Sequence, residues 1–193
     1  TGRPGDWGGN QAENLSTRYP GADRPAVDGW ALEIQAGETI AIIGRIGSGK
    51  STLLRLLTRT LEAPPDQVKI AGADVRTIPL ADLRRNVALV PQDPFLFATT
   101  LRENVAYDDP ERAMEELESA VYAAHLESTI TSFPDGYETL VGERGVTLSG
   151  GQKQRATLAR GLIRSAPILL LDDCFSSVDT ETEEHILSGL RSR

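Results

Sequence analysis

The chain has 193 residues, enough for one hydrophobic core and for one domain with an attached subdomain. Its 20 Lys and Arg against 28 Asp and Glu give a formal net charge of -8, which argues against a protein that binds nucleic-acid backbones. A mononucleotide is still compatible with this charge, because a few backbone N–H groups and one lysine can hold a triphosphate. Cys174 is the only cysteine, so no intrachain disulfide forms and we expect a reducing compartment.

The two ends of the chain predict a piece of a longer protein. Residues 1–9 are rich in glycine and lack the pattern of a signal peptide, so we predict a linker from an upstream region. The chain begins without Met and ends inside a helical pattern, from which we expect a fragment. The apolar run 166–171 is far shorter than the roughly 18 residues of a membrane span, so any membrane-spanning part lies elsewhere.

The first predicted elements are a strand, a glycine-rich loop and a helix. Residues 38–43 (ETIAII) form a short apolar run and predict a buried strand that ends at Gly44. Apolar residues at helical spacing then predict a helix that packs on the sheet; they are Leu53, Leu54, Leu56, Leu57 and Leu61.

The later elements alternate in type. Residues 110–132 are rich in Glu, Ala and Leu and predict an inserted helical region, and Ile168–Leu171 predict a second buried strand. Thr180 with Glu183 three residues later predicts a capping box at the start of a last amphipathic helix. Two buried strands with helical crossovers indicate an α/β fold with a largely parallel sheet.

Residues 44–51 match the phosphate-binding pattern G-x-x-x-x-G-K-[ST]. The glycines let N–H groups turn toward an anion, Lys50 can reach the β- and γ-phosphates, and the hydroxyl of Ser51 can coordinate Mg²⁺. A plain glycine-rich turn is the alternative, which the flanking strand and helix disfavour. The predicted nucleotide-binding residues here are Gly44, Arg45, Ile46, Gly47, Ser48, Gly49, Lys50, Ser51 and Thr52.

Asp172 follows the second apolar strand directly. A carboxylate at the end of a buried strand needs a compensating cation, and Mg²⁺ shared with Ser51 would supply one. A helix or turn cap is the alternative interpretation of this residue.

Residues 148–152 (LSGGQ) resemble the signature of ATP-binding cassette (ABC) proteins. Independently, a serine and two glycines at the start of a helix from Gln152 to Leu162 expose donors for an anion. The resemblance implies that two domains pair head to tail, and that the signature of each acts on the ATP held by the other. The signature residues in this role are Ser149, Gly150, Gly151 and Gln152.

The resemblance assigns further residues along the chain. Tyr19 is similar to the aromatic residue that stacks on adenine, and Gln92 to the glutamine that contacts Mg²⁺ between core and helical subdomain. Residues 176–179 resemble the loop that crosses the dimer interface, although helix capping would also explain them. Residues 139–145 (TLVGERG) and 95–97 are typical of exporters, in which this surface receives transmembrane domains; the alternative for the two phenylalanines is a core position.

The chain departs from the family at Asp173, where a catalytic Glu is usual. Asp is one methylene shorter, and a displacement of about 1 Å can lower a rate ~10²-fold. A switch histidine is also expected beyond Arg193, because His185 comes too early. An intact signature with a shortened carboxylate resembles the degenerate-site subunit of heterodimeric multidrug exporters.

The resemblance implies a P-loop NTPase core with a mainly parallel sheet, a small antiparallel β region and an inserted α-helical subdomain. We predict a core from residues 10–92 and 167–193, with its C-terminal part missing, and a signature subdomain from residues 93–166. The expected function is ATP hydrolysis with Mg²⁺ in an exporter, catalysed by Asp173, Gln92 and Lys50, with Ser51, Gln92 and Asp172 as metal ligands.

The expected partners are a second nucleotide-binding domain that carries the catalytic Glu and the transmembrane domains of an exporter, at the cytoplasmic face of the cell membrane, with no nucleic acid. Two alternatives stay open. One is a non-catalytic ATP-binding module that drives dimerisation. The other is a soluble ABC ATPase that acts on DNA or the ribosome.

Overall fold

The computed structural model describes residues 7, 9–142 and 145–191. It confirms the predicted α/β class, with both antiparallel and parallel pairing of strands. The chain divides into two compact units, residues 1–89 with 166–172 and residues 90–165 with 173–193. The last helix of the chain contacts a helix of the second unit.

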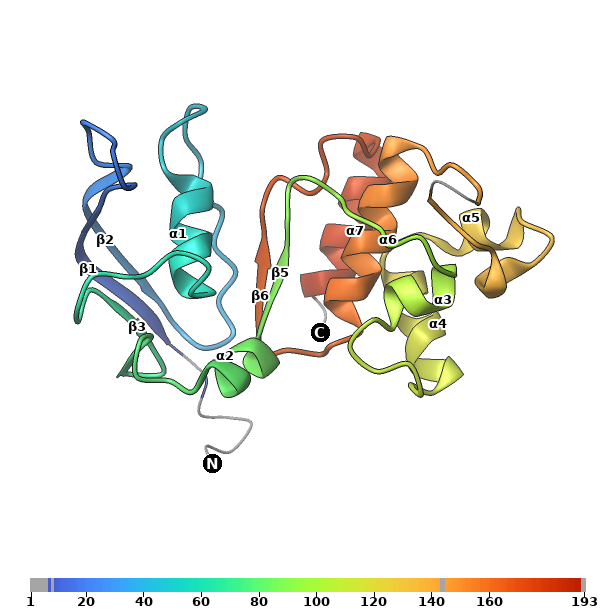
Figure 1. Cartoon of the computed structure of the whole chain (residues 1–193), viewed down its shortest axis with the longest axis horizontal. Helices are drawn as coiled ribbons and strands as arrows, with labels where there is room; N and C mark the ends of the chain where they lie inside the picture. The colour runs from blue at the N-terminus through green and yellow to red at the C-terminus, as the bar shows by residue number, and fades with distance from the viewer. Residues whose placement is uncertain (1–6, 8, 143–144, 192–193) are drawn as a thin grey trace. The chain divides into compact units, whose positions relative to one another are not determined.

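The first unit contains a four-stranded antiparallel sheet in the order β2-β1-β3-β4 (Figure 1). Its strands are β1 Asn10–Thr17, β2 Val27–Ile34, β3 Val68–Ile70 and β4 Ala73–Asp74. Ala12 and Leu15 of β1 are both buried, although strict alternation would place residues three apart on opposite faces. The register shifts between them, and Asn14 there has a φ of 48°, so a bulge returns Leu15 to the core.

The predicted helix after the glycine-rich loop is α1, Lys50–Leu57. It buries Leu53, Leu56 and Leu57 in the core cluster that also contains Val68 and Ile70. Leu61 lies beyond the end of the helix, because the chain leaves the helical conformation at Arg59, whose φ is 50°.

The buried strand predicted for residues 38–43 is wrong in its detail. These residues form no strand, and Ile43 is 93% exposed, whereas Ile42 packs against the core cluster. The segment therefore packs against the core on one side and faces solvent on the other. A strand needs a ladder partner, and none of the strand pairs between described residues includes this segment.

The second predicted strand is β6, Ile168–Leu171, with the expected bounds. Its partner is β5, Val87–Val90, which follows the short helix α2, Leu80–Asn86. All four residues of β6 are half-buried rather than buried, whereas three of the four residues of β5 are buried.

The second unit is helical, as the composition of residues 110–132 predicted. Its elements are α3 Leu101–Val105, α4 Met114–Ala123, α5 Glu127–Thr131, the 3₁₀ helix η1 Gly136–Glu138, α6 Gly150–Leu162 and α7 Thr180–Arg191 (Figure 1). Leu117, Val121 and Leu126 are buried, whereas Met114 is 39% exposed, and the helical region is interrupted at His125, which has a φ of 51°. Among the described residues, no helix is both long and apolar enough to cross a membrane.

The cap of α7 lies one residue before the predicted one. The carboxylate of Asp179 accepts hydrogen bonds from the backbone N–H of Thr182, at 2.9 Å, and from its hydroxyl, at 2.8 Å. These bonds lower the pKa of Asp179. Asp179 therefore occupies the N-cap position that the sequence analysis gave to Thr180, because its carboxylate reaches the third helical N–H.

A buried polar cluster joins α3 to α6. Asn104 is fully buried; its amide donates to the carbonyl oxygens of Phe97 and Thr100, and its Oδ1 accepts from the Phe97 N–H at 2.8 Å. The Arg160 guanidinium donates to both oxygens of Asn104 and to the Phe95 carbonyl. Burial lowers the pKa of Arg160. The cluster holds the chain between Phe95 and Thr100 against α6.

We expect Asn104→Ala to reduce the free energy of unfolding by about 3 kcal/mol, because it leaves several buried partners without hydrogen bonds. The control is Asn86→Ala, since Asn86 donates one bond, to the Asp82 carbonyl, and should cost less than about 1 kcal/mol. Urea denaturation of both variants measures the difference. Equal losses would show that the buried cluster contributes no more than an ordinary helix-end contact.

Candidate functional site

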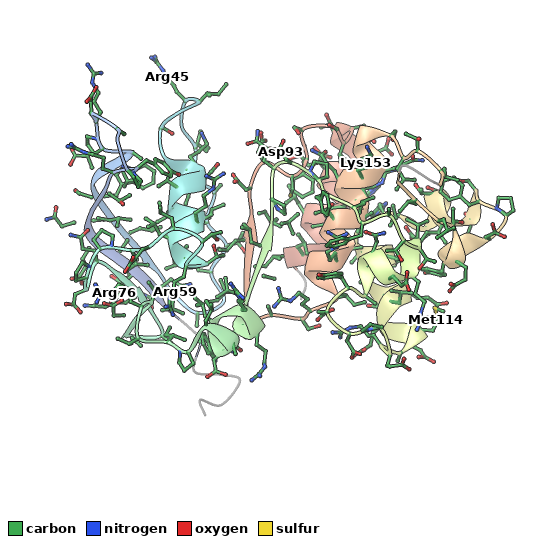
Figure 2. All side chains as sticks on the ribbon, viewed as in Figure 1. Arg45, Arg59, Arg76, Asp93, Met114 and Lys153 are labelled. Atoms are coloured by element: carbon green, nitrogen blue, oxygen red, sulfur yellow. The ribbon has the colours of Figure 1, made fainter. Side chains whose placement is uncertain are left out.

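The loop before α1 requires glycine at two positions. Gly47 and Gly49 have φ values of 81° and 93°, in the left-handed region that favours glycine. A Cβ on Gly49 would also clash with the Ala26 carbonyl oxygen and would lie 2.9 Å from Cγ2 of Val27. The loop therefore adopts the tight conformation that the phosphate-binding pattern predicts. Figure 2 shows Arg45 on this loop.

The start of α1 offers several donors to an anion. Gly49 occupies the N-cap position and supplies no side-chain acceptor, and the first turn contains no acidic residue. The Lys50 ammonium donates to the carbonyl oxygens of Gly44, at 2.7 Å, and Arg45, at 3.1 Å, so it lies over the loop. The buried Oγ of Ser48 has no protein partner among the described residues. Uncapped N–H groups, an ammonium and an unpaired hydroxyl fit a phosphate group.

Ser51 and Asp172 come together from positions 121 residues apart. The Ser51 hydroxyl donates to Oδ1 of Asp172 at 3.0 Å. A hydroxyl and a carboxylate are oxygen ligands, which Mg²⁺ takes together with phosphate oxygens and water. The described residues contain no group of three or more His, Cys, Asp or Glu side chains arranged for a metal. The pair therefore fits an ion that a nucleotide helps to hold.

Tyr19 contacts the same helix. Its hydroxyl and Oγ1 of Thr52 are 3.1 Å apart, and Thr52 is buried. This bond fixes the half-buried Tyr19 ring beside α1. Both residues belong to the predicted nucleotide-binding set, and the structure brings them together.

Gln92 and Asp173 pair in the second unit. Nε2 of Gln92 donates to Oδ2 of Asp173 at 3.2 Å, and both side chains are exposed. Asp173 has a φ of 45°, a left-handed conformation that Asp adopts more readily than most residues. Asp172 and Asp173 are neighbours in sequence, and the boundary between the compact units falls between them.

The signature residues form the start of α6. Ser149 is the N-cap: its Oγ accepts from the Gln152 N–H at 3.3 Å, and Oε1 of Gln152 accepts from the Ser149 N–H at 2.8 Å. This capping box uses the Gln152 side chain within the helix, which the sequence analysis did not foresee. Gly150 and Gly151 follow in the first turn; Gly150 is exposed, whereas Gly151 lies so close to the Ser177 carbonyl oxygen that a Cβ there would clash.

The exporter-like segments have mixed environments. Phe95 is 61% exposed, which favours a surface position over the core, whereas Phe97 is half-buried and stacks on Tyr107 at 4.5 Å between ring centroids. Of residues 139–145, Thr139 and Val141 are buried, and Glu143 and Arg144 lie outside the described residues. A groove of about 350 Å³ adjoins both segments; its lining includes Phe95, Leu96, Val141 and Val146.

The sequence analysis missed the buried side chains of Asn104 and Gln154 and the half-buried guanidinium of Arg160, all in the second unit. The available signal was their position on helices with apolar neighbours, where a polar side chain must find a partner. Which partner it finds depends on the tertiary structure.

Comparison with known proteins identifies the family of the chain. Residues 27–176 match the family model described as ABC transporter. The chain is 45% identical over 184 residues to an ATP-dependent lipid A-core flippase of Aromatoleum aromaticum, covering 93% of this chain and 30% of that protein. It is 46% identical over 170 residues to a multidrug efflux ATP-binding/permease protein of Mycobacterium bovis, covering 88% and 14%.

A solved structure of a bacterial Atm1-family ABC exporter with ATP bound is also similar, with a TM-score of 0.90, 38% identity, and coverage of 97% of this chain and 33% of that one. The chain thus spans about a third or less of the length of these relatives. The family match covers more than half of the chain and includes both the phosphate-binding loop and the signature. The chain therefore belongs to the ABC transporter family and is a nucleotide-binding domain similar to those of exporters and flippases.

Proposed function

We propose that the chain binds and hydrolyses ATP with Mg²⁺ as the motor domain of an exporter. Domains of this family bind ATP, normally with Mg²⁺, and generally hydrolyse it. The observation that carries the proposal is the 3.0 Å hydrogen bond between Ser51 and Asp172, because it joins a donor-rich helix start to a carboxylate. The similarity to flippases and multidrug exporters supports transmembrane domains as partners and a position at the cytoplasmic face of the membrane.

In the proposed mechanism the residues of the site bind the nucleotide, hold the metal ion and orient the attacking water. Lys50 and the N–H groups at the start of α1 bind the β- and γ-phosphates, and Tyr19 stacks on adenine. Ser51, Asp172 and Gln92 are the proposed ligands of Mg²⁺, which when bound neutralises charge on the phosphates. Asp173 orients the attacking water and receives its proton, and Gln92 holds the Asp173 carboxylate.

Two further parts of the proposal concern pairing. The exposed start of α6 acts on the ATP of a second nucleotide-binding domain, and that domain carries the catalytic Glu which this chain replaces by Asp173. The exposure of Ser149 and Gly150 supports the first part, and the short carboxylate supports the second. In such a heterodimer the domain's own site turns over slowly, while its signature completes the partner's site.

Lys50→Ala should lower the affinity for Mg-ATP at least tenfold, because it removes the fixed cation over the loop. Titration with a fluorescent ATP analogue measures it. Lys69→Ala makes the same change in charge on strand β3, where the ammonium faces Glu13 at 4.0 Å, and should leave binding unchanged. Equal affinities in all three proteins would exclude this loop as the nucleotide site.

Ser149→Arg should leave this domain's own ATP affinity within about twofold and lower turnover in the assembled transporter at least tenfold, because it blocks the start of α6. Both quantities are measured on one preparation. The substitution also removes the N-cap, which is worth about 1 kcal/mol, so the melting temperature is recorded alongside. Ser128→Arg, at an exposed position of α5, is the control. Lost binding with intact turnover would contradict head-to-tail pairing.

Asp173→Glu should accelerate hydrolysis at this domain's own site, by up to ~10²-fold, because the longer side chain brings its carboxylate closer to the attacking water. The left-handed backbone at Asp173 opposes part of this gain, since Glu adopts it less readily than Asp. Single-turnover hydrolysis of bound ATP is followed in the intact transporter after removal of the partner's catalytic carboxylate.

The control for this experiment is Asp135→Glu, an exposed aspartate in the same compact unit. Binding of ATP should be unchanged in both variants. Equal rates for Asp and Glu at position 173 would mean that side-chain length does not limit the reaction. They would favour the non-catalytic ATP-binding module, whose role is to drive dimerisation.

A further inference from the structure

Gln154 is a buried amide whose two ends bind one short loop. Its side chain lies on α6 and is 3% exposed. Nε2 donates to the hydroxyl of Ser176 at 2.8 Å, and Oε1 accepts from the backbone N–H of Ser177 at 2.8 Å. A buried amide is costly unless it is paired, and this one has a partner at each end.

The orientation of this amide follows from the chemistry of its partners. The Ser177 N–H can only donate, so the carbonyl oxygen of Gln154 must face it. The NH₂ group then faces Ser176, whose hydroxyl oxygen can accept. One of the two bonds thus holds the main chain of the loop, so rotamer changes of the loop's own side chains do not release it.

The first turn of α6 approaches the same loop. A Cβ on Gly151 would lie 2.6 Å from the carbonyl oxygen of Ser177, and one on Gly150 would lie 3.4 Å from its Oγ. Gly151 and Gln154 are three residues apart and therefore share a face of the helix. On this one face of α6, Gln154 accepts the hydrogen bond of the Ser177 N–H, and Gly151 packs against the Ser177 carbonyl oxygen. The glycines have a packing role within this chain, separate from their contact with any phosphate.

The far end of the loop is fixed as well. Asp179 caps α7 through two hydrogen bonds with Thr182. Residues 176–179 therefore run between two helix starts, one of which carries the signature. A displacement of α6 would carry Ser177 with it.

We propose that Gln154 is a positioning residue that joins the loop 176–179 to the signature turn 149–152, so that both surfaces meet the partner domain as one rigid unit. This inference rests on the proposed function, in which both segments face the second nucleotide-binding domain. Gln154 itself touches no nucleotide in this arrangement. Its effect on turnover passes through Ser177 and the first turn of α6.

The test is Gln154→Leu in the intact transporter, because leucine keeps most of the volume and removes both hydrogen bonds. We expect kcat for ATP hydrolysis to fall about tenfold and KM to change less than about twofold, with unchanged affinity of this domain's own site. The matched control is Thr157→Val on the same helix. Thr157 is 4% exposed and its hydroxyl has no protein partner among the described residues, so kcat should not change.

Hydrogen exchange supplies a readout that a general loss of stability would not reproduce. Exchange of the Ser177 amide should accelerate at least tenfold in Gln154→Leu and stay slow in Thr157→Val, whereas amides in the middle of α6 should be unaffected in both. Ser176→Ala removes one bond of the pair and serves if Gln154→Leu fails to fold. It should give a smaller fall in kcat, and its effect should not add to that of Gln154→Leu.

An unchanged kcat in both Gln154→Leu and Ser176→Ala would overturn the inference. The inference would also be overturned if the fall in kcat came with equal losses of own-site ATP affinity and of protection from hydrogen exchange throughout α6, because these losses would indicate unfolding. Failure of the proposed function is distinguishable, since the unmodified transporter would then neither bind nor hydrolyse ATP.

Discussion

The uncapped start of α1 is the constraint on which the candidate site depends. A helix start leaves backbone N–H groups without partners, and Gly49 offers no side-chain acceptor to them. The chain cannot place a capping residue there, because a Cβ would meet the Ala26 carbonyl. The loop that permits this close approach also brings Lys50, Ser48 and Ser51 to the same helix end. An anion is the partner that satisfies all of these donors.

The start of α6 solves the same problem differently. Ser149 and Gln152 cap the helix with each other, so its first turn is stable without an external acceptor. This difference suits the proposed division of labour, in which α1 holds the domain's own nucleotide and α6 meets one that arrives on another domain. A surface that binds a second domain must be ordered before binding. The buried amide of Gln154 and the Asn104–Arg160 cluster hold this surface in place through hydrogen bonds.

Asp173 illustrates how backbone and side chain act together at one position. Its left-handed φ of 45° is more accessible to Asp than to Glu, and its carboxylate accepts a hydrogen bond from Gln92. The shorter residue is therefore compatible with its local structure. A glutamate at this position would bring its carboxylate closer to the attacking water. It would also adopt the left-handed backbone less readily, so the two effects of the substitution oppose each other.

The amino-acid sequence by itself determined the motifs, the α/β class and most of the helices, because phosphate loops, helix caps and apolar periodicity depend on neighbouring residues. It predicted the bounds of β6 correctly. It could not predict that residues 38–43 leave Ile43 exposed, since burial of a strand depends on a distant ladder partner. The motifs suggested that Ser51 and Asp172 lie together, but the tertiary structure supplied their direct hydrogen bond. The tertiary structure alone decided the meeting of Gln154 with Ser177, because a hydrogen bond between residues far apart in sequence follows from how the chain packs.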